Sequence, residues 1–143
     1  MEIFGKVWKE KNFWLIEIPL MNAMTQGKTQ KDALRMAEDL IFEMVISYFP
    51  DMLDESFAVT VNLHDHGVVG VTTTNNSLMY ALSLKRQREI SGSTVREASE
   101  RLGSTSPNAY AQYERGKKRI SLEKYDQLLS AANPSQHAIL GVA

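Results

Sequence analysis

A run of helix start and stop signals in the C-terminal half constrains this chain more than any other feature. Thr94 and Glu97 have the T-x-x-E spacing of a capping box, and Gly103 falls where the following turn needs a positive φ. Ser106 and Pro107 predict a second start, with serine at the cap and proline in the first helical position. Two short helices joined by a glycine turn predict a helix-turn-helix, whose second helix enters the major groove of DNA.

Further helices are predicted on either side of this pair. One is expected over residues 78–89, ending at Ser91-Gly92-Ser93, and another over residues 121–132 closes the core. The helix that begins at Ser106 is expected to run to Arg115, with Gly116 ending it. The side chains expected to face the core are Leu78, Ala81, Leu82, Leu84, Val95, Ala98, Leu102, Tyr110, Leu122, Tyr125, Leu128 and Leu129.

The helical half also carries a recognisable set of residues, namely Ala98, Gly103, Tyr110 and the run Tyr113-Glu114-Arg115-Gly116-Lys117. On these, residues 79–133 resemble the Cro/CI-like (Xre) family of DNA-binding domains. The resemblance implies a structural ion pair between Arg88 and Glu114 that ties the first helix to the recognition helix. Two departures are that Val95 replaces the family's glutamine, which removes a phosphate contact, and that the turn after Gly103 is one residue longer.

This register predicts which side chains meet DNA. The groove-facing set is Ser106, Pro107, Asn108 and Gln112. Asparagine and glutamine can each bind adenine through two hydrogen bonds, which discriminates between bases. The phosphate-contacting set is Arg115, Lys117, Lys118 and Arg119, which would add affinity without sequence choice. The alternative is that this basic run is only a solvated turn.

The N-terminal half alternates apolar and polar residues, which indicates strands. They are expected over residues 2–8 and 13–18, joined by a hairpin connection at residues 9–12, with a short extended piece near residues 23–26. Pro19 ends the second strand, because proline cannot donate a hydrogen bond to a sheet.

An amphipathic helix is predicted next. Thr29 can cap its start, Asp32 is placed to reach back toward the cap, and Pro50 stops it. Its expected apolar stripe is Leu34, Ala37, Ile41, Met44 and Tyr48.

Two more strands complete the pattern. They are expected over residues 57–63, with the odd-numbered residues on one buried face, and over residues 68–72, after a turn at His66-Gly67. A polar linker at residues 72–77 then leads into the helices. The expected fold class is α+β: a small β-β-(β)-α-β-β domain followed by an all-α helix-turn-helix domain.

Charge divides the chain in the same way. Residues 1–78 hold 6 Lys and Arg against 11 Asp and Glu, a balance of −5, and residues 79–126 hold 10 against 6, a balance of +4. An acidic half joined to a basic half predicts two kinds of partner, with chance clustering as the alternative.

Composition narrows the remaining classes. The chain has no cysteine, which excludes disulfides and cysteine-ligated metal sites. No apolar run approaches the roughly 20 residues that span a bilayer, and the N-terminus does not read as a signal peptide. We therefore expect a cytoplasmic protein with no membrane segment and no cofactor.

Thr25-Gln26-Gly27, Thr29 and Ala33 resemble the Thr-Gln-Gly-x-Thr…Ala stretch of the HicB antitoxin family. The resemblance implies a partial ribonuclease H-like domain at residues 1–73 that blocks a small HicA-like, mRNA-cleaving toxin. It also implies a Cro/CI-like domain at residues 79–133 that binds operator DNA and represses the pair's own operon in a bacterium, as a homodimer or higher homo-oligomer. Residues 134–143 form a tail. The toxin contact is expected on the hairpin of residues 2–18 and on the sheet around residues 57–72.

Other hypotheses are a repressor whose N-terminal half senses a small molecule or dimerises, and an RNA-processing enzyme. A ribonuclease H site needs about four converging carboxylates on two metal ions. Glu2, Glu17 and Asp65 are scattered along the chain, so we expect no catalysis. His64 and His66 could share a strand face as metal ligands, but such a pair is more often structural, so no metal is expected.

Overall fold

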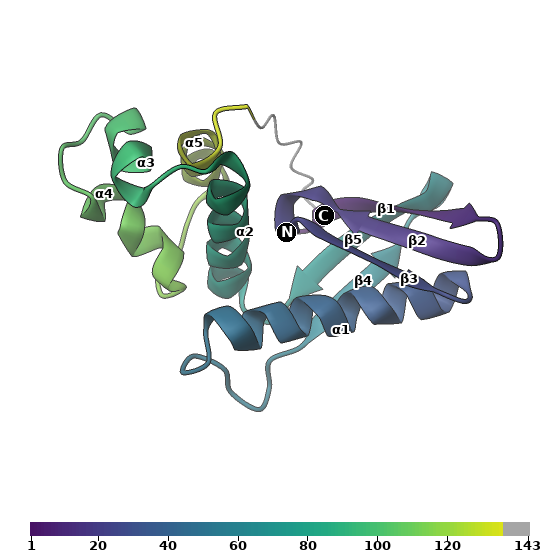
Figure 1. The fold of residues 1–143 in the computed structure, drawn as a ribbon. Coiled ribbons are helices and arrows are strands. Elements are labelled where there is room, and N and C mark those ends of the chain that lie inside the picture. The colour runs from purple at the N-terminus through teal and green to yellow at the C-terminus, as the bar shows by residue number, and fades with distance from the viewer. Residues whose placement is uncertain (136–143) are drawn as a thin grey trace. The chain divides into compact units, whose positions relative to one another are not determined.

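The computed structural model describes residues 1–135, and these form two compact units, residues 1–75 (unit 1) and residues 76–135 (unit 2). Unit 1 combines a sheet with one long helix, and unit 2 consists of helices, as Figure 1 shows by colour along the chain. The α+β class expected from the sequence is confirmed. Of the predicted tail, residues 136–143 lie outside the described residues.

Unit 1 contains a five-stranded antiparallel sheet in the order β3-β2-β1-β5-β4. Its strands are β1 (Ile3–Glu10), β2 (Phe13–Ile18), β3 (Ala23–Gly27), β4 (Val59–Leu63) and β5 (Val68–Thr73). Helix α1 (Gln30–Tyr48) follows β3 and packs against the sheet (Figure 1). The predicted order β-β-(β)-α-β-β is therefore confirmed.

The hairpin between β1 and β2 is tighter than expected. The predicted connection at residues 9–12 is wrong, because Lys9 pairs with Trp14 and Glu10 pairs with Phe13. Only two residues turn the chain, and the first of them, Lys11, has a left-handed backbone with φ 48°. Ladder pairing thus continues to the last residue that has a partner, although Lys9 and Glu10 are polar.

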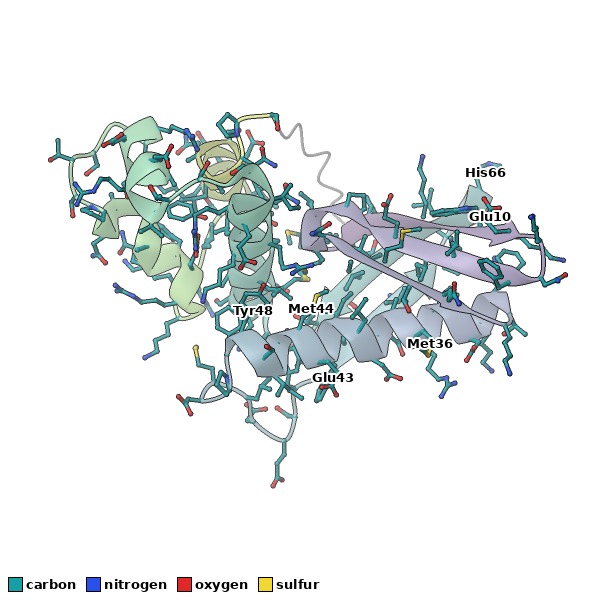
Figure 2. The ribbon with its side chains drawn as sticks, in the orientation of Figure 1. Glu10, Met36, Glu43, Met44, Tyr48 and His66 are labelled. Atoms are coloured by element: carbon teal, nitrogen blue, oxygen red, sulfur yellow. The ribbon has the colours of Figure 1, made fainter. Side chains whose placement is uncertain are left out.

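Helix α1 begins as the sequence predicts but faces the sheet differently. Thr29 Oγ1 accepts a hydrogen bond from Asp32 N at 3.0 Å, whereas the Asp32 carboxylate reaches past the cap to Lys28 N at 3.1 Å. The predicted stripe is wrong in part. Met44 and Tyr48 are only half-buried, along the helix labelled in Figure 2. The fully buried positions are Ala33, Ala37, Ile41 and Val45.

A close approach of backbone explains this choice of face. A Cβ on Gly27 would lie 2.4 Å from Ala33 N, so the first turn of α1 is packed directly on β3. At this separation alanine fits under the helix, and larger side chains are placed on its flanks. Within residues 1–135, no helix has both the length and the apolar composition that a bilayer crossing demands.

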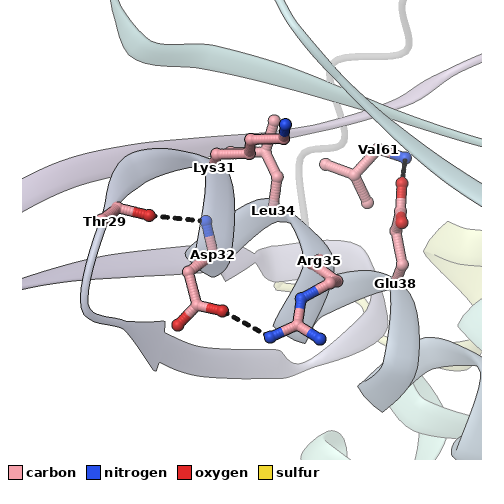
Figure 3. A pocket seen from close by; sticks show the side chains of 7 residues that line it. All are labelled: Thr29, Lys31, Asp32, Leu34, Arg35, Glu38 and Val61. Atoms are coloured by element: carbon pink, nitrogen blue, oxygen red, sulfur yellow. Dashed lines mark hydrogen bonds and ion pairs between the residues drawn. The ribbon is translucent and has the colours of Figure 1, made fainter.

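The edge strand β4 is closed by a side chain of α1. Val61 N donates a hydrogen bond to Glu38 Oε2 at 2.8 Å, beside the exposed ion pair of Arg35 and Asp32 at 2.7 Å (Figure 3). These residues line a shallow groove of about 500 Å³ between α1 and β4. The expected burial of all odd-numbered residues of this strand is wrong for Leu63, which is 45% exposed at the strand's end.

The predicted polar linker at residues 72–77 is mostly wrong. Strand β5 continues to Thr73, which pairs with Val59 of β4, and the next helix already begins at Asn76. Polar threonines extend β5 because it lies between two partner strands, β1 and β4, that can accept its backbone groups.

Unit 2 is built from short helices. They are α2 (Asn76–Ser91), α3 (Val95–Arg101), α4 (Asn108–Ala111), which continues as a 3-10 turn (Gln112–Arg115), and α5 (Leu122–Ala132). The predicted core positions Tyr110, Tyr125 and Leu128 are fully buried. Leu122 is wrong as a core position, because it is 36% exposed in the first turn of α5.

Two buried phenols in this unit give a pH-dependent prediction. Burial raises the pKa of Tyr110 and of Tyr125 far above the ordinary value of about 10. In the unfolded chain both phenols ionise near that ordinary value, so their contribution to stability is complete below it and is lost as pH rises above it. We expect the free energy of unfolding to fall above about pH 10.

Ultraviolet absorbance of tyrosinate, recorded together with circular dichroism, checks this. Tyr110 and Tyr125 should ionise only as the helical signal is lost, and Tyr110→Phe should reduce the alkaline loss of stability. Reversible ionisation of all five tyrosines with the helical signal intact would contradict it.

Candidate nucleic-acid interface

The turn between α3 and α4 is set by local signals. Thr94 Oγ1 accepts from Glu97 N at 3.1 Å and the Glu97 carboxylate accepts from Thr94 N at 3.0 Å, so the predicted capping box is present. These bonds lower the pKa of Glu97. Gly103 has φ 84°, the left-handed conformation predicted for it. Gly116, with φ 80°, ends the 3-10 turn that follows α4.

The start of α4 differs from the prediction. The helix begins at Asn108, after Pro107, and no residue at this start supplies a capping side chain, so the predicted cap at Ser106 is wrong. The bond comes instead from α3: Ser99 Oγ accepts from Tyr110 N at 3.1 Å and donates to Pro107 O at 2.8 Å. Ser99 was missed in the sequence because its partners lie eight and eleven residues away.

The recognition segment, residues 108–115, has an inner and an outer face. Tyr110 and Glu114 are buried, and Tyr110 Oη donates to Leu84 O at 3.4 Å. Residues two positions from a buried helical residue point to the opposite side. Asn108 and Gln112 are therefore directed away from the core, and Arg115 is exposed just beyond them.

An ion pair joins α2 to this segment. Arg88 Nε lies 2.7 Å from Glu114 Oε2, and a second guanidinium nitrogen lies 2.9 Å from Oε1, so the contact is bidentate. The Glu114 side chain is only 5% exposed and that of Arg88 22%. The hydrogen bond to Glu114 raises the pKa of Arg88. Arg88 also donates to Ser93 O at 3.2 Å, which holds the loop before α3.

The basic run lies beside the recognition segment. Arg115, Lys117, Lys118 and Arg119 are all exposed. The Tyr113 ring holds two ammonium groups near its face, Lys118 at 5.8 Å and Lys124 at 5.4 Å from its centroid. Lys124, in the first turn of α5, was missed in the sequence and enlarges the positive surface.

The predicted DNA contacts fall within residues 106–119. Ser106 and Asn108 are exposed, whereas Pro107 and Gln112 are half-buried. Gln112 Nε2 donates weakly to Ala109 O at 3.4 Å, which leaves its amide oxygen directed away from that contact. One short segment thus presents two amides next to a row of cations.

The carboxylates of unit 1 do not converge in this way. Glu2 is buried and accepts from His64 Nε2 at 3.1 Å, in a space that Gly70 leaves by lacking a Cβ. Glu17 pairs across the sheet with Lys6, which is four residues, or about 13 Å, from Glu2 along β1. In the described chain, residues 1–135, no three His, Cys, Asp or Glu side chains are grouped for a metal ion.

Comparison with known proteins agrees with this geometry. Residues 84–133, which are 50 of the 143 residues, match the family model described as helix-turn-helix. Unit 2 therefore contains a helix-turn-helix domain, the DNA-binding part of a transcriptional regulator. A search of curated proteins finds no match to the chain.

Proposed function

We propose that this protein is the antitoxin of a type II toxin–antitoxin pair. Unit 2 binds operator DNA and represses the pair's own operon, and unit 1 neutralises a small HicA-like, mRNA-cleaving toxin by direct binding. The observation that carries the DNA-binding part is the outer face of the recognition segment, where Asn108 and Gln112 lie opposite buried Tyr110 and Glu114.

Each side chain of this face has a role in the proposal. Ser106, Pro107, Asn108 and Gln112 meet base edges in the major groove, and Arg115, Lys117, Lys118 and Arg119 meet phosphates. A domain with one recognition helix binds weakly, so the protein acts as a two-fold homodimer, or a higher homo-oligomer, on two half-sites.

The toxin-binding part rests on the sequence resemblance and on the surface of unit 1. The resemblance at residues 25–33 is to HicB antitoxins, whose N-terminal half is a partial ribonuclease H-like domain. Ile3 and Val7 of β1 are buried, so the alternate residue Trp8 points to the other face of the sheet. On that face Phe13 is 36% and Met24 is 51% exposed. An apolar face on an acidic unit suits a basic, RNA-binding partner.

Unit 1 is proposed to bind and not to catalyse. Glu2 and Glu17 are too far apart along the sheet to share a metal ion, which disfavours a ribonuclease H reaction. The proposed place of action is the bacterial cytoplasm, where both operon and mRNA are found.

Growth of cells that express the small neighbouring reading frame tests the proposal. The full chain should restore growth, and Phe13→Asp with Met24→Asp should abolish the rescue. Ile46→Asp is the matched control, because Ile46 on α1 is also 37% exposed, and it should still rescue. If the neighbour is harmless, or if the full chain does not restore growth, the antitoxin role is wrong.

A second candidate is a helix-turn-helix repressor whose unit 1 senses a small molecule or dimerises. The groove of about 500 Å³ lined by Thr29, Leu34 and Glu38 favours it (Figure 3). Its carboxylates, Asp32 and Glu38, are already bonded to Arg35 and to Val61 N, which weakens it as a polar ligand site.

A further inference from the structure

We propose that Ser99, in α3, is a positioning residue that fixes the start of the recognition helix and thereby sets how well the protein discriminates between DNA sequences. The inference rests on the proposed groove-facing role of Asn108 and Gln112. It assigns no DNA contact to Ser99 itself, which is buried and only 1% exposed.

The start of α4 needs an outside partner. The first N–H groups of a helix have no partner within the helix and are usually bonded by the N-cap side chain. Pro107 is the N-cap here, and proline has no side-chain acceptor. The third helical residue, Tyr110, is completely buried, so water does not replace the missing cap. Ser99 Oγ accepts from Tyr110 N at 3.1 Å and fills this role from a neighbouring helix.

The same hydroxyl also fixes the cap residue. It donates to Pro107 O at 2.8 Å, so one oxygen atom holds both the first residue of the start and the third helical residue. The backbone carbonyl of Ser99 accepts from Leu102 N at 3.0 Å and from Ser104 N at 3.1 Å. Ser99 therefore holds the turn of the helix-turn-helix at its beginning and at its end.

This arrangement acts on sequence choice more than on general affinity. Asn108 and Gln112 lie two residues before and after Tyr110, so a shift of Tyr110 N moves both amides. Two hydrogen bonds to one base edge require a fixed direction, whereas a lysine on a flexible stem can still reach a phosphate. Loss of the Ser99 hydroxyl should thus lower binding to the preferred sequence and leave non-specific binding nearly unchanged.

The test compares Ser99→Ala with Ser83→Ala in the full chain. Ser83 is a matched control: its hydroxyl is fully buried in the same unit and bonds to Tyr80 O and Tyr125 Oη, away from the recognition segment. The probes are a duplex that the wild-type protein selects from a random pool and a scrambled duplex of the same composition. Titrations are made below the unfolding transition of each variant, as shown by circular dichroism.

For Ser99→Ala we expect the ratio of selected to scrambled affinity to fall roughly tenfold, with the salt dependence unchanged. Hydrogen exchange of the Tyr110 amide should become faster. Ser83→Ala should keep the ratio even if it is less stable, and Ser99→Thr, which retains a hydroxyl, should recover it in part. If Ser99→Ala does not fold, Ser99→Cys, with its weaker donor and acceptor, carries the same comparison.

The outcomes separate the two levels of the argument. A wild-type protein that prefers the selected duplex, with a Ser99→Ala variant that keeps the full preference, overturns the positioning role alone. An equal loss in Ser83→Ala also overturns it, because general destabilisation then explains the effect. A wild-type protein that selects no sequence overturns the proposed operator function itself.

Discussion

Replacing Arg88 by alanine is expected to lower the free energy of unfolding of unit 2 by about 3 kcal/mol. The change leaves the Glu114 carboxylate, 5% exposed, without the guanidinium that is bonded to both of its oxygens. An unpaired buried charge costs more than the pair itself contributes, because the carboxylate keeps its desolvation penalty and loses its compensation. We place the value at the low end of the range because Arg88 is partly exposed.

Urea titration of the helical circular dichroism signal measures this loss. Trp8 and Trp14, the only tryptophans of the chain, both belong to unit 1, so their fluorescence follows that unit separately. Arg88→Met combined with Glu114→Leu should restore part of the loss, since no charge then stays buried alone. Arg35→Ala removes an exposed ion pair and should change little. Equal effects of Arg88→Ala and Arg35→Ala would show that the buried pair is not a structural link.

Changing Lys117, Lys118 and Arg119 to glutamine is expected to weaken DNA binding roughly a hundredfold or more at about 0.1 M salt. Three phosphate contacts release three sets of counterions, so the slope of log affinity against log salt should fall by about 2.7. The loss should be the same for preferred and scrambled duplexes, because phosphate contacts carry no sequence information.

The matched control has the same change of net charge in unit 1. Lys6, Lys9 and Lys11 of the hairpin are also exposed, and their replacement by glutamine should leave both affinity and slope nearly unchanged. Gln112→Ala gives the complementary result, a lower preference at constant slope. If the hairpin variant loses as much as the basic-run variant, DNA binding depends on net charge and not on this surface.

Local signals account for the parts of the site that could be predicted from the sequence. The Thr94 and Glu97 spacing and the left-handed Gly103 involve residues within ten positions of one another, and both are present as expected. Ser99 and Lys124 act on partners brought near by folding, and no spacing in the sequence announces a serine that caps another helix.

The errors in unit 1 have a related cause. Periodicity identified α1, but it ranked large side chains above Ala33 and Ala37, which fit where the helix touches β3 most closely. Composition also assigned Thr73 to a linker, although Val59 of the neighbouring strand determines where β5 ends. The positions of elements were readable from local chemistry, whereas their contact faces depend on the distance between packed backbones.

The carboxylate of Glu38 has a consequence for how the chain behaves in concentrated solution. A sheet that ends in an open strand offers its outermost amides to any extended segment that passes, which is how soluble proteins begin to assemble into fibrils. Here the central outward amide of that strand, Val61 N, is already bonded within the same molecule. A newly made chain can therefore accumulate to high copy number without recruiting its neighbours along β4, and Glu38→Ala is the change that should make storage at high concentration difficult.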